Sequence, residues 1–143
     1  MVYYRIGGRF MSSVTWSFVT PLKDNNKIEA VKSLLSISFP EELVHLIEAN
    51  NGGSPSLTRC NIPGFGETDF KMLLSYNNCD EESVFDVLDF FIKKYHKRVL
   101  PFASDSGSGY YCIKDDYVVY ASEETDSLYP LAEDINSFFD LLY

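Results

Sequence analysis

The side chains best suited to chemistry are two histidines and three cysteines. His45 and His96 lie in different predicted helices, and neither accompanies a serine or cysteine in a recognised nucleophile motif. We therefore interpret both histidines as structural or solvated residues. The cysteines are odd in number and lack a CxxC spacing, which argues against a disulfide framework and against a zinc site. These cysteines are Cys60, Cys79 and Cys112, and the sequence assigns no catalytic, cofactor-binding or metal-binding residue.

A glycine-rich segment, Ser106-Gly107-Ser108-Gly109, resembles a phosphate-binding loop in composition only. The phosphate loops of dinucleotide-binding and P-loop proteins lead directly into a helix, whose N-terminus binds the anion. Here a tyrosine-rich segment with the pattern of a strand follows instead. The segment is therefore interpreted as a tight turn, in which glycine supplies the backbone freedom.

Carboxylates gather late in the chain, at Asp115, Asp116, Glu123, Glu124 and Asp126. Their spacing lacks the alternating ligand pattern of an EF-hand calcium loop. An acid and base pair for catalysis needs a geometry that the sequence does not provide. Two interpretations stay open: the solvated end of a hairpin, or an acidic face that binds a basic partner.

If the protein binds a basic partner, we expect the contact at an acidic end of the predicted sheet. The turn between Ala103 and Tyr110 and the end of the hairpin project there, where loops commonly carry function. Acidic groups would set the rate and orientation of association, while tyrosines would supply contact area. The expected partner-binding residues are Asp105, Tyr110, Asp115, Asp116, Tyr117, Tyr120, Glu123, Glu124 and Asp126.

Length and charge narrow the classes of function. The chain has 143 residues and 45% hydrophobic residues, which fits one domain with a sizeable core. Its 21 acidic and 12 basic residues give a net charge of −9, which repels nucleic acids and anionic membranes. This charge favours a basic protein partner, or else serves solubility alone. We expect a monomer or weak dimer.

The cellular compartment is predicted from what the sequence lacks. There is no apolar run of about 18 residues that could span a membrane, and the first ten residues lack the apolar stretch of a signal peptide. Together with the odd number of cysteines, this predicts a cytoplasmic protein in a reducing environment. Residues 1–13 are expected to form a flexible extension of the single domain, and Met11 is an alternative start.

Helices are predicted at four places along the chain. Asn26 and Glu29 resemble a capping box for the first helix. The second helix begins near Pro40 and ends at 50–53, where asparagine and glycine tolerate a left-handed cap. The third helix is predicted to start at Asp80, and the last one to be capped by Asp134. The apolar face of the third helix comprises Val84, Val87, Leu88, Phe91, Ile92 and Tyr95.

Strands are predicted between and after these helices. Alternating apolar residues indicate a strand over 70–76, whereas 51–66 is rich in glycine and proline and is interpreted as loop or short irregular strands. A brief apolar strand at 99–103 precedes a hairpin of 110–114 and 117–122. These elements predict an α+β fold in which helices flank a central, largely antiparallel sheet. The predicted core comprises Trp16, Phe39, Leu43, Ile47, Leu88, Phe91, Phe102, Tyr111, Ile113, Phe138 and Leu142.

An ordered set of short motifs resembles the SUKH superfamily. The most characteristic stretch is residues 100–105, Leu-Pro-Phe-Ala-Ser-Asp, followed by Gly107, Gly109 and the residues 111–113, Tyr-Cys-Ile. Two departures concern Ala121-Ser122, where the family often has an aromatic or histidine, and Gly107-Ser108-Gly109, which replaces adjacent glycines. The resemblance covers roughly 14–142. Further matching residues are Trp16, Phe39-Pro40, Asn51-Gly52-Gly53, Phe70 to Tyr76, Asp80 to Ser83, Val119-Tyr120, Glu123, Leu131-Ala132 and Phe138-Phe139.

The resemblance implies a function as well as a fold. The superfamily includes a yeast regulator of cell-wall synthesis and many bacterial immunity proteins, and it implies an α+β fold without catalytic residues. In bacteria it implies a protein that binds and silences a toxin, often a nuclease, delivered between competing cells. The alternatives are a regulatory scaffold of the yeast type and a hydrolase whose motif the sequence does not reveal. A toxin gene directly upstream would favour immunity.

Overall fold

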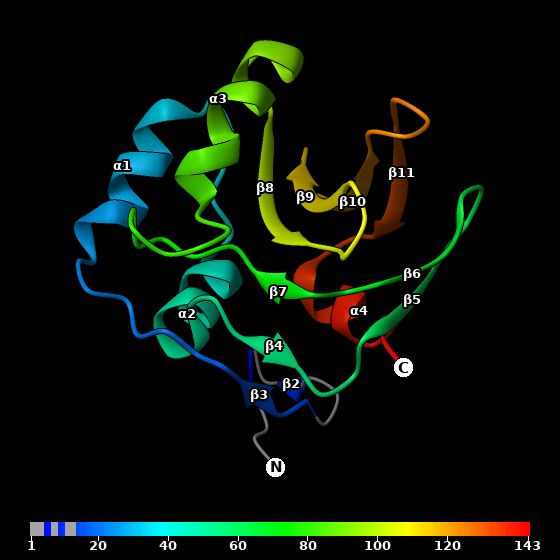
Figure 1. The fold of residues 1–143 in the computed structure, drawn as a ribbon, viewed down its shortest axis with the longest axis horizontal. Coiled ribbons are helices and arrows are strands. Elements are labelled where there is room, and N and C mark those ends of the chain that lie inside the picture. Colours follow the sequence, from blue (N-terminus) through cyan, green and yellow to red (C-terminus); the bar gives the residue numbers. More distant parts are fainter. Residues whose placement is uncertain (1–4, 7–8, 11–13) are drawn as a thin grey trace.

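The computed structural model of the protein describes residues 5–6, 9–10 and 14–143. In this part of the chain, the largest element is a five-stranded antiparallel sheet with strand order β11-β10-β9-β8-β7 (Figure 1). The predicted α+β fold with a central antiparallel sheet is therefore confirmed. The strands of this sheet are β7 (Met72–Leu73), β8 (Val99–Ser104), β9 (Gly109–Lys114), β10 (Tyr117–Ser122) and β11 (Ser127–Ala132).

Three small antiparallel pairs accompany the central sheet. β5 (Arg59–Ile62) and β6 (Gly66–Asp69) form a hairpin within the segment interpreted as loop or irregular strands. β3 (Trp16–Ser17), which precedes both helices, pairs with β4 (Ser54–Pro55), which follows the second helix. β1 (Arg5–Ile6) pairs with β2 (Arg9–Phe10) in the segment expected to be a flexible extension. The rest of residues 1–13 lies outside the described part of the chain.

The first two helices bury apolar faces that the sequence pattern predicts. α1 (Asn26–Leu34) buries Ile28 and Val31, but its N-cap is Asn25 without a side-chain hydrogen bond. The predicted capping box at Asn26 is therefore wrong, because Asn26 already lies inside the helix and its backbone amide donates to Asp24. α2 (Glu41–Asn50) follows Pro40, as predicted, and carries its acidic residues in the first turn.

α3 (Val84–Tyr95) begins later than the sequence predicts. Ser83 is the N-cap, and its hydroxyl accepts a hydrogen bond from the backbone amide of Phe85. Asp80 does not cap this helix, because its carboxylate accepts hydrogen bonds from Ser75 and Asn77 instead. Glu82 lies outside the helix with a left-handed backbone at φ 53°. The acidic residues before Ser83 therefore form a separate turn whose side chains are available for other contacts.

The two faces of the central sheet carry different apolar clusters. One face joins the main core, which includes Phe102, Tyr111 and Phe138. α3 packs along β8 (Figure 1), and a second cluster of Phe91, Val99, Cys112, Val119 and Ala121 forms there. α4 (Ile135–Phe139) contacts β10 and β11, and Asp134 caps it through a hydrogen bond from the backbone amide of Ser137. The cap predicted at Asp134 is confirmed.

Most of the predicted core is buried. Trp16 and Phe39 are only half-buried and pack against the main cluster from outside it. The predicted strand at 70–76 shortens to β7, and its alternation fails because Leu73 and Leu74 are both buried. The confirmed buried residues are Leu43, Ile47, Leu88, Phe91, Phe102, Tyr111, Ile113, Phe138 and Leu142.

Candidate functional site

The structure divides the predicted partner-binding residues between two opposite ends of the sheet. Ser104 pairs with Tyr110 and Ser122 with Gly109, so the β8–β9 and β10–β11 turns meet at one end. Lys114 pairs with both Val99 and Tyr117, so the β9–β10 turn lies at the other end. The expectation of one acidic end is corrected, because successive turns of an antiparallel meander alternate between its ends.

The end formed by the β9–β10 turn has mixed charge and a structural explanation. Asp115 and Asp116 have left-handed backbones at φ 49° and 68°, the conformation that a tight two-residue hairpin turn needs and that aspartate tolerates. Arg98 lies 3.5 Å from the Asp115 carboxylate, and Lys114 adjoins the turn. Tyr117 is exposed beside them. This end therefore carries charges of both signs, and Asp116 lines a pocket there together with Glu42, Glu133 and Asp134.

Asp105 is an interior ligand of its own turn rather than a surface carboxylate. Only 5% of the residue is exposed. Its Oδ1 accepts hydrogen bonds from the backbone amides of Gly107 and Gly109, each at 2.9 Å. Its Oδ2 accepts hydrogen bonds from the hydroxyls of Thr68 and Tyr120. A buried carboxylate with this many donors fixes the conformation of the β8–β9 turn.

Tyr120 is likewise buried, with 2% of the residue exposed. Burial, followed by its hydrogen bond to Asp105, raises the pKa of the Tyr120 hydroxyl well above its usual value. The structure therefore corrects the expectation that Asp105 and Tyr120 belong to an exposed contact surface. The two side chains are hydrogen-bond partners inside the fold, and together they hold the β8–β9 turn in place.

The end of the sheet formed by the β8–β9 and β10–β11 turns is richer in carboxylates than the sequence suggests. Lys71 forms an ion pair with Glu82 at 2.6 Å, and the Ser104 hydroxyl donates to the same carboxylate at 2.9 Å. Asp69 accepts hydrogen bonds from the backbone amide and hydroxyl of Ser106. We call this region the acidic end, and its carboxylates are Asp69, Glu81, Glu82, Asp105, Glu123, Glu124 and Asp126.

The environment of the Tyr110 hydroxyl shows that several of these carboxylates lie near one another. Its ring packs edge-on against Phe91, with 5.5 Å between centroids, and the residue is half-buried. Burial raises the pKa of the Tyr110 hydroxyl, and the negative charges of Glu123, Glu82 and Asp105 raise it further. The turn before α3 and the β10–β11 turn therefore contribute to one electrostatic environment, although they are far apart in the sequence.

Three exposed carboxylates of the acidic end lie on the β10–β11 turn. Glu123 and Glu124 are exposed, and the backbone amide of Thr125 donates to the Ser122 hydroxyl to shape the turn. The Asp126 side chain is 73% exposed and pairs with Lys94 from the last turn of α3. Glu123 and Glu124 are thus predicted partner-binding carboxylates that the structure leaves exposed.

A polar network links two sequence-distant segments, Asn51 and residues 75–80, beside the acidic end. The Asn51 amide donates to the Ser75 hydroxyl at 3.0 Å, and its Oδ1 accepts from the backbone amide of Tyr76 at 2.8 Å. Ser75 in turn donates to Asp80 at 2.7 Å, and Asn77 donates to the same carboxylate at 2.9 Å. These residues are largely buried, so the network positions the turn that carries Glu81 and Glu82.

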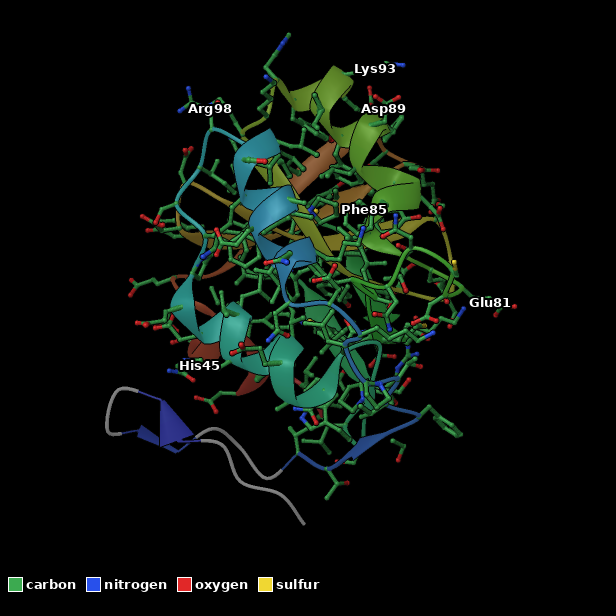
Figure 2. The ribbon with its side chains drawn as sticks, turned by 90° about the vertical axis from the view of Figure 1, so that its left-hand side faces the viewer. His45, Glu81, Phe85, Asp89, Lys93 and Arg98 are labelled. Carbon is green, nitrogen blue, oxygen red and sulfur yellow. The ribbon has the colours of Figure 1, made fainter. Side chains whose placement is uncertain are left out.

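The histidines and cysteines are dispersed in the structure. His45 lies on the outer surface of α2 (Figure 2), and His96 ends α3 in a left-handed conformation. Residues 5–6, 9–10 and 14–143 contain no group of three or more histidine, cysteine or acidic side chains placed to hold a metal ion. Within the same residues, no helix is long and apolar enough to cross a bilayer.

The three thiols are expected to differ sharply in reactivity. Cys79 is exposed, whereas Cys60 and Cys112 are buried. Burial raises the pKa of the Cys60 thiol to about 11 and raises the pKa of Cys112 well above its usual value. Because the thiolate is the reactive form, a disulfide reagent at pH 8 should label Cys79 rapidly and the other two only after denaturation. Rapid labelling of the native Cys79→Ser variant would contradict this expectation.

Comparison with known proteins identifies the family. The comparison with curated proteins found no match. The model of the SMI1 / KNR4 family (SUKH-1) matches residues 24–141, which include α1, the central sheet and α4. This match agrees with the motifs at 100–113, which form β8, the turn held by Asp105, and β9. The chain therefore belongs to the SMI1 / KNR4 (SUKH-1) family.

Proposed function

We propose that the protein is a non-catalytic binding domain that neutralises a basic protein toxin through the acidic end of its sheet. The observation that carries the proposal is the exposure of Glu123 and Glu124 on a turn beside the half-buried Tyr110. A carboxylate surface on a rigid scaffold speeds encounter with a positively charged partner, and an adjacent aromatic ring adds contact area.

The chemistry expected of such a toxin supports a basic partner. A toxic nuclease must bind phosphates, so its active surface is positively charged. The net charge of −9 attracts such a surface over a long range. Within the acidic end, the cations that form ion pairs are Lys71, held by Glu82, and Lys94, held by Asp126. Glu123 and Glu124 remain available for a partner because they form no ion pair within the described residues.

Several observations favour binding over catalysis. His45 and His96 are exposed on separate elements, so they do not form a pair that could transfer protons at one site. The thiol of Cys112 is buried, and its raised pKa disfavours the nucleophilic thiolate. Membership of the SMI1 / KNR4 (SUKH-1) family is compatible with both immunity and regulation. A regulatory scaffold is therefore the alternative, and it would use the same surface for a cellular partner.

Charge reversal at the β10–β11 turn tests this proposal. The partner is first identified by pull-down from the source cell and by expressing the product of the neighbouring gene. Replacing Glu123, Glu124 and Asp126 by lysine should slow association at least about ten-fold at low salt, because electrostatic steering raises association rates far above the neutral value. Stopped-flow measurements should show a smaller loss at 1 M salt, where the Debye length is about 3 Å.

A second variant separates local charge from net charge. Replacing the exposed Glu29, Glu48 and Glu133 by lysine changes the net charge by the same amount away from the acidic end. This control should slow association much less than the first variant, while both keep the native circular dichroism spectrum. Equal slowing in the two variants would place the interface elsewhere and would overturn the proposal.

A further inference from the structure

A pocket with a cavity volume of about 340 Å³ lies beside the polar network of Ser75 and Asp80. Its volume falls within the roughly 300–1,000 Å³ typical of ligand pockets. The pocket is lined by Phe18, which follows β3, and by Gly52, which precedes β4. Met72 on β7 and Glu81 in the turn before α3 also line it. The pocket therefore combines the aromatic ring of Phe18, the thioether side chain of Met72 and the carboxylates of Asp80 and Glu81.

Phe18 is the feature of this pocket that the fold does not explain. The residue is 86% exposed, the largest value among the exposed large hydrophobic residues of the described chain. Its backbone is left-handed at φ 59°, a conformation that is uncommon for a residue with a side chain. Neither the exposure nor this backbone conformation stabilises the native state, and the ring is open to a contact outside the chain.

The two carboxylates keep acceptors free toward a partner. Asp80 binds Ser75 and Asn77 through Oδ2, and within the described residues Oδ1 accepts no hydrogen bond. These hydrogen bonds lower the pKa of Asp80, so the group stays ionised at neutral pH. Glu81 is exposed, forms no ion pair in the described part of the chain, and extends away from the ribbon (Figure 2). The pocket thus presents two carboxylates beside an open aromatic face, and Lys23 lies near enough to Asp80 to lower the pKa of that carboxyl further.

The pocket is continuous with the acidic end. Met72 on β7 pairs with Ser104 on β8, and the Ser104 hydroxyl donates to Glu82. Glu82 is next to Glu81 in the sequence and also binds Lys71. A partner seated on the acidic end can therefore reach the pocket across the Lys71 and Glu82 pair.

We propose that this pocket receives an arginine side chain of the partner protein, an inference that rests on the binding function proposed above. A guanidinium group is planar, stacks on an aromatic face and donates several hydrogen bonds in a fixed arrangement. Phe18 provides the face, and Asp80 and Glu81 provide the acceptors. A lysine ammonium is a compact, strongly hydrated charge, so it stacks less favourably on the ring and forms weaker hydrogen bonds with the two carboxylates.

Nuclear magnetic resonance with small probes tests the pocket without the partner. Acetyl-arginine methylamide is titrated to millimolar concentrations against the labelled full-length protein, at constant ionic strength. The amide signals of Phe18, Gly52 and Glu81 should shift and saturate. The lysine analogue, which has the same charge, should bind at least about three-fold more weakly, and the uncharged citrulline analogue should not bind. Equal shifts with the lysine and arginine probes would overturn the preference for a guanidinium group.

Two substitutions keep this test independent of folding. Phe18→Gly suits the left-handed backbone and should leave the melting temperature unchanged or higher, while it weakens binding of the arginine probe about two- to five-fold. Glu81→Gln should weaken it by a similar factor. The matched control is Phe90→Gly at another exposed phenylalanine, which should leave the probe affinity unchanged although it destabilises α3.

The outcomes separate this inference from the proposed function. If the arginine probe shifts only signals of the β10–β11 turn, or binds Phe18→Gly as well as the wild type, the pocket is not an arginine site. The charge-reversal experiment can still succeed in that case. If the probe binds as expected but the charge-reversal variant associates normally, the acidic end fails as the interface and the pocket stands by itself.

Discussion

Replacing Phe138 by alanine is expected to lower the free energy of unfolding by about 3–5 kcal/mol, the usual cost of removing a fully buried aromatic ring. Phe138 is completely buried on α4. Its ring centroid lies 5.8 Å from Phe70, 5.9 Å from Phe102, 5.3 Å from Tyr111 and 5.1 Å from Phe139. These rings come from four segments of the chain, so the cavity would weaken the attachment of α4 to the sheet.

Urea unfolding measures this loss, and two further variants locate it. Phe91→Ala should cost a similar amount, because Phe91 is the centre of the cluster on the opposite face of the sheet. Phe90→Ala is the matched control: Phe90 is the neighbouring residue on α3 and is 47% exposed. Phe90→Ala should lower the free energy of unfolding by about 1 kcal/mol or less. Near-native stability of Phe138→Ala and Phe91→Ala would mean that this core layout is wrong.

The strongly periodic elements could be predicted from the sequence, and the irregular ones could not. The buried face of α3 and the cap at Asp134 follow from spacing and residue type. β11 was not predicted, because Pro130 interrupts its pattern, although proline is compatible with an edge strand. The sequence predicts too early a start for α3, because Asp80 resembles an N-cap residue while its carboxylate in fact accepts a hydrogen bond from Ser75.

The candidate site was predicted in part, and its errors have physical causes. The hairpin about Asp115 and Asp116 was predicted, and it already implies that its turn lies opposite the flanking turns. This alternation alone places Asp115 and Asp116 at the opposite end of the sheet from Glu123. The burial of Asp105 depends on Thr68 and Tyr120, which are remote in sequence. The contribution of Glu82 to the acidic end depends equally on tertiary contacts with Lys71 and Ser104.

Replacing Gly109 by alanine is expected to be as damaging as the loss of a core ring. A Cβ atom at this position would lie 1.9 Å from the hydroxyl oxygen and 2.3 Å from Cζ of Tyr120. The Tyr120 ring cannot simply turn away, because it packs against Phe65 and Tyr111 and its hydroxyl donates to Asp105. Overpacking a core costs about 1–3 kcal/mol, and breaking a buried hydrogen bond adds about 1–3 kcal/mol.

The neighbouring glycine provides the matched control. At Gly107, an added Cβ would meet only the Asp105 carboxylate, at 3.6 Å, and the backbone there is not left-handed. Gly107→Ala should therefore change the free energy of unfolding by no more than about 0.5 kcal/mol, as is usual for exposed sites. Both glycine amides donate to Asp105, so the pair separates the steric requirement at Gly109 from the hydrogen bonds of the turn.

A double-mutant cycle assigns the cost to Tyr120. In a Tyr120→Ala background the space beside Gly109 is empty, so Gly109→Ala should cost much less than it does in the wild type. Removing the hydroxyl alone, in Tyr120→Phe, should give little relief because the ring carbon at 2.3 Å remains. Equal costs in the wild-type and Tyr120→Ala backgrounds would contradict the steric explanation. The glycine at 109 is required because the ring that anchors Asp105, and with it the turn at the acidic end, lies against the backbone of that residue.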